Sequence, residues 1–256
     1  MNQFSLPQSI SLLDDLSSIE SWHEGRLILI DKPLDWTSFD LVNKSKISLR
    51  DGLGIRKSKI GHAGTLDPKA TGLMILLTGK FTKMTDYIHT FDKTYDAVFF
   101  IGATTPCYDT ERPIDAHYAI DHITNELIYE VSNKFKGKII QYPPAFSAVK
   151  IDGHIAYKAA RKGKEVITRA REVEVFDFNI QKIELPFIHI KIRCSSGTYI
   201  RSIANDMGKA LGSGAYLAAL KRTSIGPWSL SNAYSIDDFV NKIRSYQMSE
   251  VIQSIQ

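Results

Sequence analysis

Short strand-like segments recur along this chain and mostly follow one another as hairpins. Residues 26–33 (RLILIDKP) and 72–79 (GLMILLTG) are continuous apolar runs, as expected of buried strands. Residues 93–102, 172–185 and 187–197 alternate apolar and polar side chains, which is typical of strands with one buried face. Strands with interspersed helices, but without regular βαβ units, predict an α+β fold around a mixed, mainly antiparallel sheet.

Helices are expected at six places between these strands, including residues 81–90 and residues 154–163, which Gly163 ends. Ser38 is predicted to cap a helix that runs to about Arg50. Residues 119–132 and 198–212 have helical spacing, and Ser235 is predicted to cap a last helix near the C-terminus.

Composition narrows the class of protein. The 256 residues are 43% hydrophobic and 23% charged, as in soluble globular proteins. No apolar run approaches the ~20 residues that span a bilayer, and the N-terminus lacks the pattern of a secretory signal. Cys107 and Cys194 are far apart and outside any CxxC pattern. We therefore expect a reduced, cytoplasmic protein without a disulfide framework or a zinc ribbon.

Charge is unevenly distributed along the chain. Residues 44–59 contain six Lys or Arg and one acid, and residues 158–171 contain six Lys or Arg and one acid. The first 25 residues instead carry four acids and no Lys or Arg. Concentrated basic stretches attract phosphate backbones, but they also occur on ordinary solvated surfaces. From charge alone, both interpretations stay open.

The segment from Gly61 to Gly72 (GHAGTLDPKATG) combines glycines and a proline with one histidine and one aspartate. Its glycines and Pro68 predict a loop, and Pro68 restricts the backbone of Asp67 to an extended conformation. A fixed backbone would help to hold the Asp67 carboxylate in one direction. Alternatively, Asp67 caps the next element and His62 is an incidental loop residue.

Several enzyme classes lack their motifs here. Gly79-Lys80 is followed by Phe81, so the phosphate-binding GxxxxGK[ST] pattern fails, and neither HExxH nor GxSxG occurs. The seven histidines show no metal-ligand spacing. The sequence therefore predicts neither a metal nor a cofactor.

Residues 61–83 (GHAGTLDPKATGLMILLTGKFTK) closely resemble the catalytic motif of the TruB family of pseudouridine synthases. Five further segments fall in the order that the family shows: LILIDKPLDWTS (27–38), DKTYDAVFFIGATT (92–105), YPPAFSAVKIDGHIAYKAARKG (142–163), CSSGTYIRSIANDMGKALG (194–212) and GAYLAALKRTSIGPW (214–228). The resemblance implies a catalytic domain over residues 26–240, after an acidic extension at 1–25. The tail at 241–256 is too short for the PUA-type RNA-binding domain of many bacterial members.

The resemblance also implies the fold and the reaction. The fold is the α+β pseudouridine-synthase core, with a mixed, mainly antiparallel sheet of about eight strands. The reaction isomerises uridine 55 in the T-arm of tRNA, after the base has flipped out of its stack. Because no atom is gained or lost, no cofactor is needed. We expect a monomeric enzyme that binds tRNA and neither a membrane nor a metal.

By the same resemblance, three residues carry the chemistry. Asp67 is the nucleophile, in the manner of the carboxylate of a retaining glycosidase. Arg201 pairs with Asp67 and keeps it ionised. Tyr95 stacks on the flipped uracil and takes part in proton transfer. The predicted substrate contacts are His62, Tyr199, Leu220 and Lys32, together with Lys150 and Tyr157. For Lys32, a structural role at the end of its strand is equally consistent with the sequence.

Two other functions remain open at this stage. The chain could be a non-catalytic module that binds or folds RNA on the same scaffold. It could also be a related synthase that acts on ribosomal or guided RNA.

Overall fold

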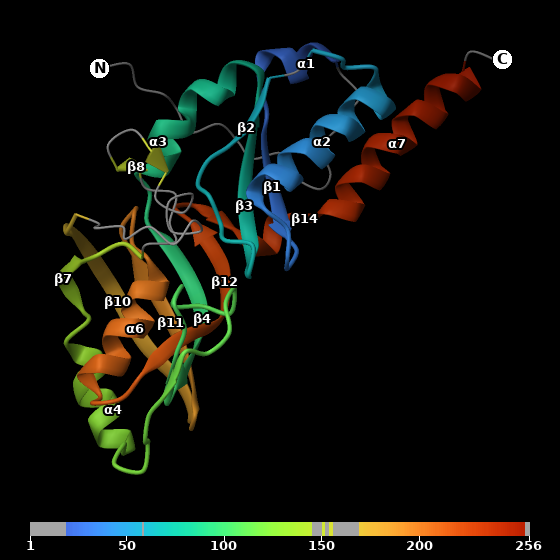
Figure 1. The fold of residues 1–256 in the computed structure, drawn as a ribbon. Coiled ribbons are helices and arrows are strands. Elements are labelled where there is room, and N and C mark those ends of the chain that lie inside the picture. Colours follow the sequence, from blue (N-terminus) through green and yellow to red (C-terminus); the bar gives the residue numbers. More distant parts are fainter. Residues whose placement is uncertain (1–18, 58, 145–149, 152–153, 156–168, 254–256) are drawn as a thin grey trace. The chain divides into compact units, whose positions relative to one another are not determined.

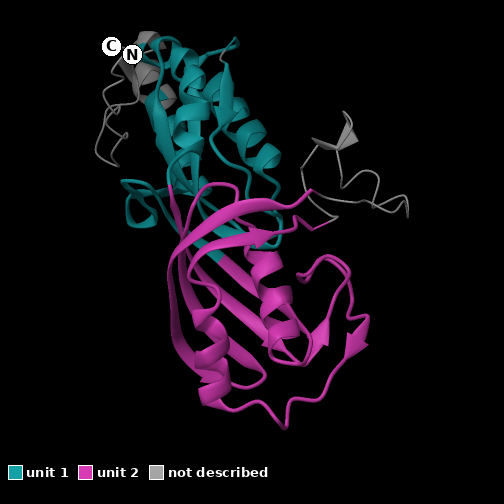
Figure 2. Cartoon of the chain, turned by 90° about the vertical axis from the view of Figure 1, so that its left-hand side faces the viewer, with its two compact units in different colours: residues 1–91, 221–256 teal, residues 92–220 magenta. Residues whose placement is uncertain are grey.

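The computed structural model describes residues 19–57, 59–144, 150–151, 154–155 and 169–253. The chain forms two compact units (Figure 2). Unit 1 consists of residues 1–91 and 221–256, and unit 2 of residues 92–220.

Unit 1 contains both ends of the chain. Its elements are α1 (Ile19–Glu24), β1 (Leu27–Lys32), α2 (Ser38–Leu53), β2 (Ile60–His62), β3 (Ala70–Thr78), the 3-10 helix η1 (Gly79–Met84), α3 (Thr85–His89), β13 (Trp228–Ser229), the 3-10 helix η2 (Leu230–Asn232), β14 (Tyr234–Ser235) and α7 (Ile236–Gln253). Strand β12 (Ala215–Ile225) belongs to both units, since residues 221–225 lie in unit 1.

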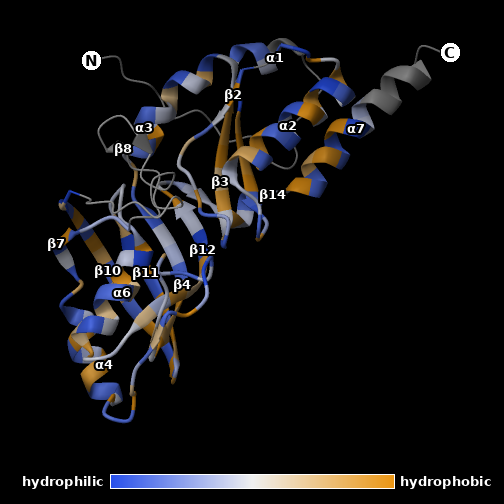
Figure 3. Ribbon diagram, viewed as in Figure 1, coloured by the Kyte–Doolittle hydropathy of each residue, from blue (hydrophilic) through white to orange (hydrophobic). Residues whose placement is uncertain are grey.

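In unit 1 the strands are ordered β14-β1-β3-β12, with β2 beside β3 and β13 beside β12. β1 is antiparallel to β3 and parallel to β14. Strands β1 and β3 are hydrophobic along most of their length (Figure 3). Helices α2 and α7 pack together, and α7 contacts β1 (Figure 1). A separate core cluster joins β1 and β3 to Met84, Ile88 and Trp228. Burial on both sides explains the continuous apolar runs.

Unit 2 contains the alternating strands. Its elements are β4 (Lys93–Ile101), β5 (Ala103–Thr104), β6 (Ala116–His117), α4 (Asn125–Asn133), β7 (Gly137–Gln141), β8 (Lys150–Ile151), β9 (His154–Ile155), β10 (Arg171–Glu184), β11 (Phe187–Cys194) and α6 (Ile200–Ala210). The strand order is β12-β4-β11-β10-β7, and the β4–β11, β11–β10 and β10–β7 pairs are antiparallel. Helix α4 packs on β10 and α6 packs on β4.

The predicted fold class is confirmed. Within the described residues, eight strands lie on the main hydrogen-bonded path, and the short β2 and β13 join it from the side. The β1–β14 pair is parallel and the other pairs with a described register are antiparallel, so the sheet is mixed and mainly antiparallel. None of the described helices is both long and apolar enough to cross a membrane.

The cap of α2 differs from the prediction. Thr37, not Ser38, is the N-cap, and it forms a capping box with Asp40. Ser38 is already the first residue of the helix, and its buried hydroxyl is left available for another purpose. The predicted cap of α7 is correct, since the Asp238 amide donates to Ser235 Oγ at 3.0 Å.

The acidic N-terminal segment ends in a helix that is part of unit 1. The Trp22 side chain of α1 is fully buried, in edge contact with Phe239 of α7. The Arg26 guanidinium lies over the Trp22 ring, with its Cζ 4.9 Å from the ring centroid. Trp22 O also accepts a hydrogen bond from the buried Thr78 hydroxyl at 3.2 Å.

We expect the Trp22→Ala variant to lose about 3–5 kcal/mol in the free energy of unfolding, because it leaves a large cavity in the core. Urea denaturation followed by circular dichroism measures this loss. Glu24→Ala, at an exposed position of the same helix, is the matched control and should change stability by less than about 0.5 kcal/mol. A loss below about 1 kcal/mol for Trp22→Ala would show that α1 is not an integral part of the unit.

Candidate active site

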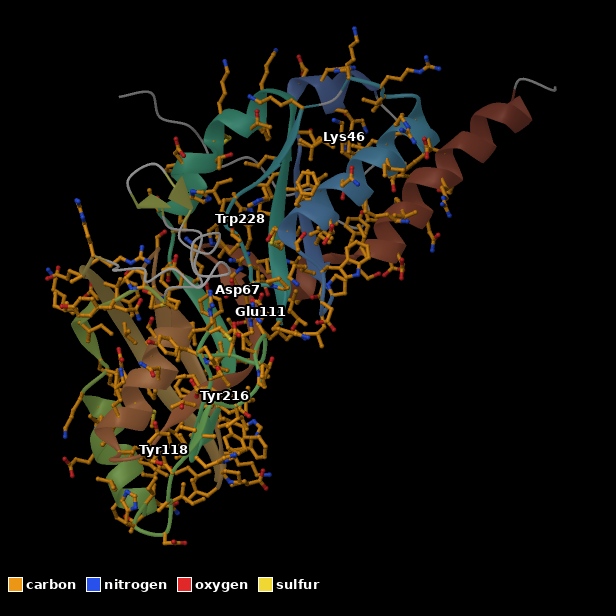
Figure 4. The ribbon with its side chains drawn as sticks, viewed as in Figure 1. Lys46, Asp67, Glu111, Tyr118, Tyr216 and Trp228 are labelled. Carbon is orange, nitrogen blue, oxygen red and sulfur yellow. The ribbon has the colours of Figure 1, made fainter. Side chains whose placement is uncertain are left out.

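Asp67 lies in the loop between β2 and β3, here called the β2–β3 loop (residues 63–69; Figure 4). Its two chain neighbours are each fixed by hydrogen bonds. Ser38 Oγ accepts from the Leu66 amide at 3.0 Å and donates to the Leu66 carbonyl at 3.1 Å. On the other side, the Pro68 carbonyl accepts from the Asp35 amide at 2.9 Å. The backbone on both sides of the carboxylate is therefore held from α2 and from the turn before it.

Lys32 holds the same loop from the end of β1. Its side chain is fully buried, and Nζ donates to the carbonyls of Pro33 at 2.8 Å, Trp36 at 2.7 Å and Pro68 at 3.4 Å. An ammonium has three donors, so these three acceptors match it. These hydrogen bonds attach the Lys32 side chain to the turn after β1 and to Pro68 of the β2–β3 loop.

Lys32 and Asp67 also interact electrostatically. Burial lowers the pKa of the Lys32 ammonium to about 8, while the Asp67 and Asp35 carboxylates oppose this shift. The charged lysine is retained near neutral pH because its three carbonyl acceptors and the carboxylates offset part of the desolvation cost. A positive charge therefore lies in the neighbourhood of Asp67.

The lowered pKa of Lys32 predicts a pH-dependent stability. Since the folded protein binds this proton less tightly than the unfolded chain, with its pKa of 10.5, unfolding takes up a proton between about pH 8 and 10.5. Stability should therefore rise with pH in this window. Relative to Lys32→Met, the wild type should gain roughly 2 kcal/mol between pH 7 and 9.5. Urea unfolding of both proteins at several pH values measures the difference, and a flat difference would contradict the shift.

Arg222 connects the β2–β3 loop to β3. Its side chain is 2% exposed, and its Nε donates to the Leu73 carbonyl at 2.7 Å. Its two terminal nitrogens donate to the carbonyls of Gly64 at 3.1 Å and Thr65 at 3.4 Å. A side chain on Gly72, which has a φ of +103°, would place its Cβ 2.4 Å from the Arg222 carbonyl oxygen. Gly72, the third glycine of the segment from Gly61 to Gly72, is thus required for this close approach.

His62 precedes this loop at the end of β2, opposite Leu76 of β3. Its Nδ1 is buried and has no hydrogen-bond partner among the described residues. Burial lowers the pKa of His62, and the charges of His89 and Arg222 lower it further, so the ring is neutral at pH 7. A neutral imidazole suits the predicted contact with RNA bases better than a role as a charged acid.

Arg201 has a partner in unit 2 that the sequence did not indicate. It lies in the first turn of α6, and its Nη1 is 3.4 Å from Asp109 Oδ2 and 3.3 Å from the Cys107 carbonyl oxygen. Both side chains of the ion pair are 4% exposed. Asp109 is itself oriented, because its Oδ1 accepts from the Glu111 amide at 2.9 Å. This pair fixes one edge of the Arg201 guanidinium.

The other predicted residues of unit 2 lie on separate elements. Tyr95 is in β4, 8% exposed and opposite Ile192 of β11. Leu220 is in β12 and also 8% exposed. Tyr199 is the N-cap residue of α6 and is partly buried.

The structure thus places Asp67, Lys32 and His62 together in unit 1, whereas Tyr95, Arg201, Tyr199 and Leu220 lie in unit 2. The Lys150 side chain and Tyr157 are outside the described residues, as are residues 158–168 of the second basic stretch. Sequence reasoning missed three residues that contact the β2–β3 loop or Arg201, namely Ser38, Arg222 and Asp109. In the part of the chain that the structure describes, no group of three or more His, Cys, Asp or Glu residues could hold a metal ion.

Comparison with protein families gives two matches that adjoin. Residues 50–200 match the TruB family pseudouridylate synthase N-terminal domain. Residues 201–255 match the tRNA pseudouridylate synthase B C-terminal domain, and this match includes the segment 241–256 that the sequence analysis set apart as a tail.

Curated relatives match nearly the whole chain. The protein named tRNA pseudouridine synthase B from Phocaeicola vulgatus is 45% identical over 232 residues, which cover 91% of this chain and 99% of the relative. A protein of the same name from Flavobacterium johnsoniae is 47% identical over 226 residues, covering 88% of this chain and 99% of the relative.

Among solved structures, a chain in a crystal structure of a Cbf5-Nop10-Gar1 complex matches with a TM-score of 0.64 and 28% identity, over 86% of this chain. The match spans only 54% of that solved chain. On the strength of the family models and of the curated relatives, this chain belongs to the TruB family of pseudouridylate synthases.

Proposed function

We propose that this enzyme isomerises uridine 55 in the T-arm of tRNA, with Asp67 as its nucleophile. The curated relatives are named tRNA pseudouridine synthase B, which supports tRNA as the substrate class. The observation that carries the role of Asp67 is the double anchoring of its loop. Ser38 fixes the residue before it and Lys32 the residue after it. Such pre-organisation is what a nucleophile needs, and a structural surface aspartate does not need it.

The chemistry fits a lone, well-positioned carboxylate. The glycosidic bond between N1 and C1′ breaks, the uracil turns, and C5 bonds to C1′ while the C5 hydrogen leaves as a proton. No atom is lost from the nucleotide overall, because N1 takes up a proton in exchange. During detachment an electron-poor centre forms, which an ionised carboxylate traps or stabilises. The positive charge of Lys32, together with Arg201, would keep Asp67 ionised in a partly buried place.

The remaining residues complete the proposal. Tyr95 stacks on the extruded uracil and assists proton transfer, and Tyr199 and Leu220 form the walls of its pocket. His62 fills the space that the base leaves in the RNA. The motif match supports these roles, and the low exposure of Tyr95 and Leu220, 8% each, suits apolar pocket walls.

Phosphate contacts are assigned to basic side chains. In the first basic stretch, Lys46, Arg50, Arg56, Lys57 and Lys59 are exposed. Lys150 and Tyr157 are weaker candidates from the motif alone. We further propose that residues 26–240 form the catalytic domain and that the enzyme acts as a monomer in the cytoplasm, where its tRNA substrate is found.

One assay separates this function from its alternatives. Unmodified tRNA carrying tritium at C5 of uridine is incubated with the protein, and tritium release is measured. The product position is then mapped, and the assay is repeated with tRNA in which uridine 55 is replaced by cytidine. Release from the first tRNA, lost with the second, is the expected result. Binding without release would indicate a non-catalytic RNA module, and modification at another position would indicate a synthase with a different target.

A further inference from the structure

The backbone of Tyr199, the proposed pocket wall, is hydrogen-bonded to Gln141 of β7 in the sheet of unit 2. The Gln141 side chain is 1% exposed and bonds both backbone groups of Tyr199. Its Oε1 accepts from the Tyr199 amide at 2.7 Å, and its Nε2 donates to the Tyr199 carbonyl at 2.9 Å. This bidentate contact fixes the point from which the tyrosine side chain leaves the backbone.

Arg171 covers the ring of the same tyrosine. Arg171 lies opposite Gln141 in the β10–β7 register, and its Cζ is 4.6 Å from the centroid of the Tyr199 ring. Gly197, which has a φ of +83°, lies beside the same guanidinium, and a Cβ built there would be 3.4 Å from Arg171 Nη1, an ordinary contact distance. The guanidinium therefore lies over the ring at the distance of a cation–π contact.

The hydrogen-bonding state of this guanidinium is unusual. Its Nε and Nη2 are both buried, and neither has a hydrogen-bond partner among the described residues. A buried N–H group without an acceptor costs about 1–3 kcal/mol, and more when the group is charged. Within the part of the chain that the structure describes, Arg171 therefore has two buried donors of a charged group without an acceptor.

Arg193 provides an internal comparison in the same unit. Its Cζ lies 5.2 Å from the centroid of the Phe176 ring, so it too is an arginine stacked on an aromatic ring. However, its Nε is 2.5 Å from Asp92 Oδ2, and its Nη1 is 3.7 Å from Asp177 Oδ2. Stacking on an aromatic ring therefore does not by itself leave a guanidinium without an anion. Among the described residues Arg171 has no such anion, and a phosphate of a bound ligand is an acceptor that its Nε and Nη2 would suit.

We propose that Arg171 binds a backbone phosphate of the substrate RNA, next to the nucleotide that Tyr199 contacts. A phosphodiester offers two oxygens at the spacing of the guanidinium fork, which is the geometry that the free Nε and Nη2 present. Because Tyr199 and Arg171 are stacked, binding of the phosphate also fixes the ring. This inference rests on the proposed function, since it assumes that RNA is the substrate.

Salt dependence distinguishes a phosphate contact from a purely structural role. The logarithm of the binding constant for RNA falls linearly with the logarithm of the salt concentration. Loss of one phosphate contact reduces the magnitude of this slope by about 0.7–1, whereas loss of a residue that only supports Tyr199 leaves the slope unchanged. Binding of unmodified tRNA is measured between 50 and 300 mM salt, with all variants made in the Asp67→Asn background so that no turnover interferes. Thermal melts confirm that each variant is folded.

For Arg171→Gln we expect the slope to fall by about 0.7–1 and affinity near physiological salt to weaken roughly tenfold. Arg171→Lys keeps one charge, so its slope should stay near the wild-type value while affinity falls less. The matched control, Arg193→Gln, removes a stacked arginine whose charge is already paired, and should change neither quantity appreciably.

An unchanged slope and affinity for Arg171→Gln would overturn the inference. An equal fall for Arg193→Gln would also overturn it, because the effect would then reflect net charge rather than a site. Tritium release by the otherwise wild-type enzyme tests the proposed function separately. If wild type releases tritium and the Arg171→Gln slope is unchanged, only the phosphate site fails. If wild type binds tRNA without release, the function fails and the phosphate site is still decided by the slopes.

Discussion

Asp67→Asn is expected to abolish tritium release, with a loss of more than about a thousandfold in rate. Asparagine has nearly the same shape but cannot carry the negative charge that traps the electron-poor centre. The variant should remain folded, because Ser38 and Lys32 hold its loop through the backbone of Leu66 and Pro68, which the substitution leaves in place. Affinity for tRNA, measured by filter binding, should change by less than about threefold.

Asp86→Asn is the matched control for this substitution. Asp86 is an exposed residue of α3 in the same unit, and its replacement removes the same charge at a distance from the loop. It should keep wild-type release. Retention of more than a tenth of the rate by Asp67→Asn would show that the carboxylate is not the nucleophile, and the reaction would then need another group.

The main elements of the fold could be predicted from the sequence because the burial of a strand determines the spacing of its apolar residues. β1 and β3 are buried on both faces and appear as continuous apolar runs, while β4, β10 and β11 alternate. The cap of α2 could not be assigned in the same way. Thr37 and Ser38 are both good caps, and the choice is decided by Leu66, which lies 28 residues further along the chain and engages the Ser38 hydroxyl.

The site was predictable only where chemistry depends on a motif. Asp67 was proposed from its motif, but the contacts that hold its loop could not be predicted in this way. Arg222 donates to three carbonyls, and backbone carbonyls carry no sequence signal. Asp109 lies 92 residues before its ion-pair partner Arg201, in a segment without a motif of its own. Long-range pairs of this kind need tertiary structure, because the sequence contains many other acidic residues that could serve.

Arg222→Met should reduce the rate of tritium release by roughly a hundredfold, with little change in tRNA affinity. The substitution leaves the carbonyls of Gly64, Thr65 and Leu73 without their buried donor, so the β2–β3 loop loses its attachment to β3. A displacement of about 1 Å in a reacting group can cost this much in rate. The lost hydrogen bonds should also reduce the free energy of unfolding by about 3 kcal/mol. Single-turnover rates and urea unfolding measure the two effects.

Two further variants decide whether the effect comes from geometry. Arg222→Lys keeps the buried charge, but a compact ammonium does not reproduce the planar fork that reaches Gly64, Thr65 and Leu73 from β12, so its rate should lie between those of Met and wild type. The control, Lys221→Met, removes a neighbouring exposed cation whose side chain points to the other face of β12, and should be neutral. Because the rate is measured where each variant remains folded, lost stability cannot account for a slower reaction. A full wild-type rate for a folded Arg222→Met would mean that Ser38 and Lys32 suffice to aim the Asp67 carboxylate.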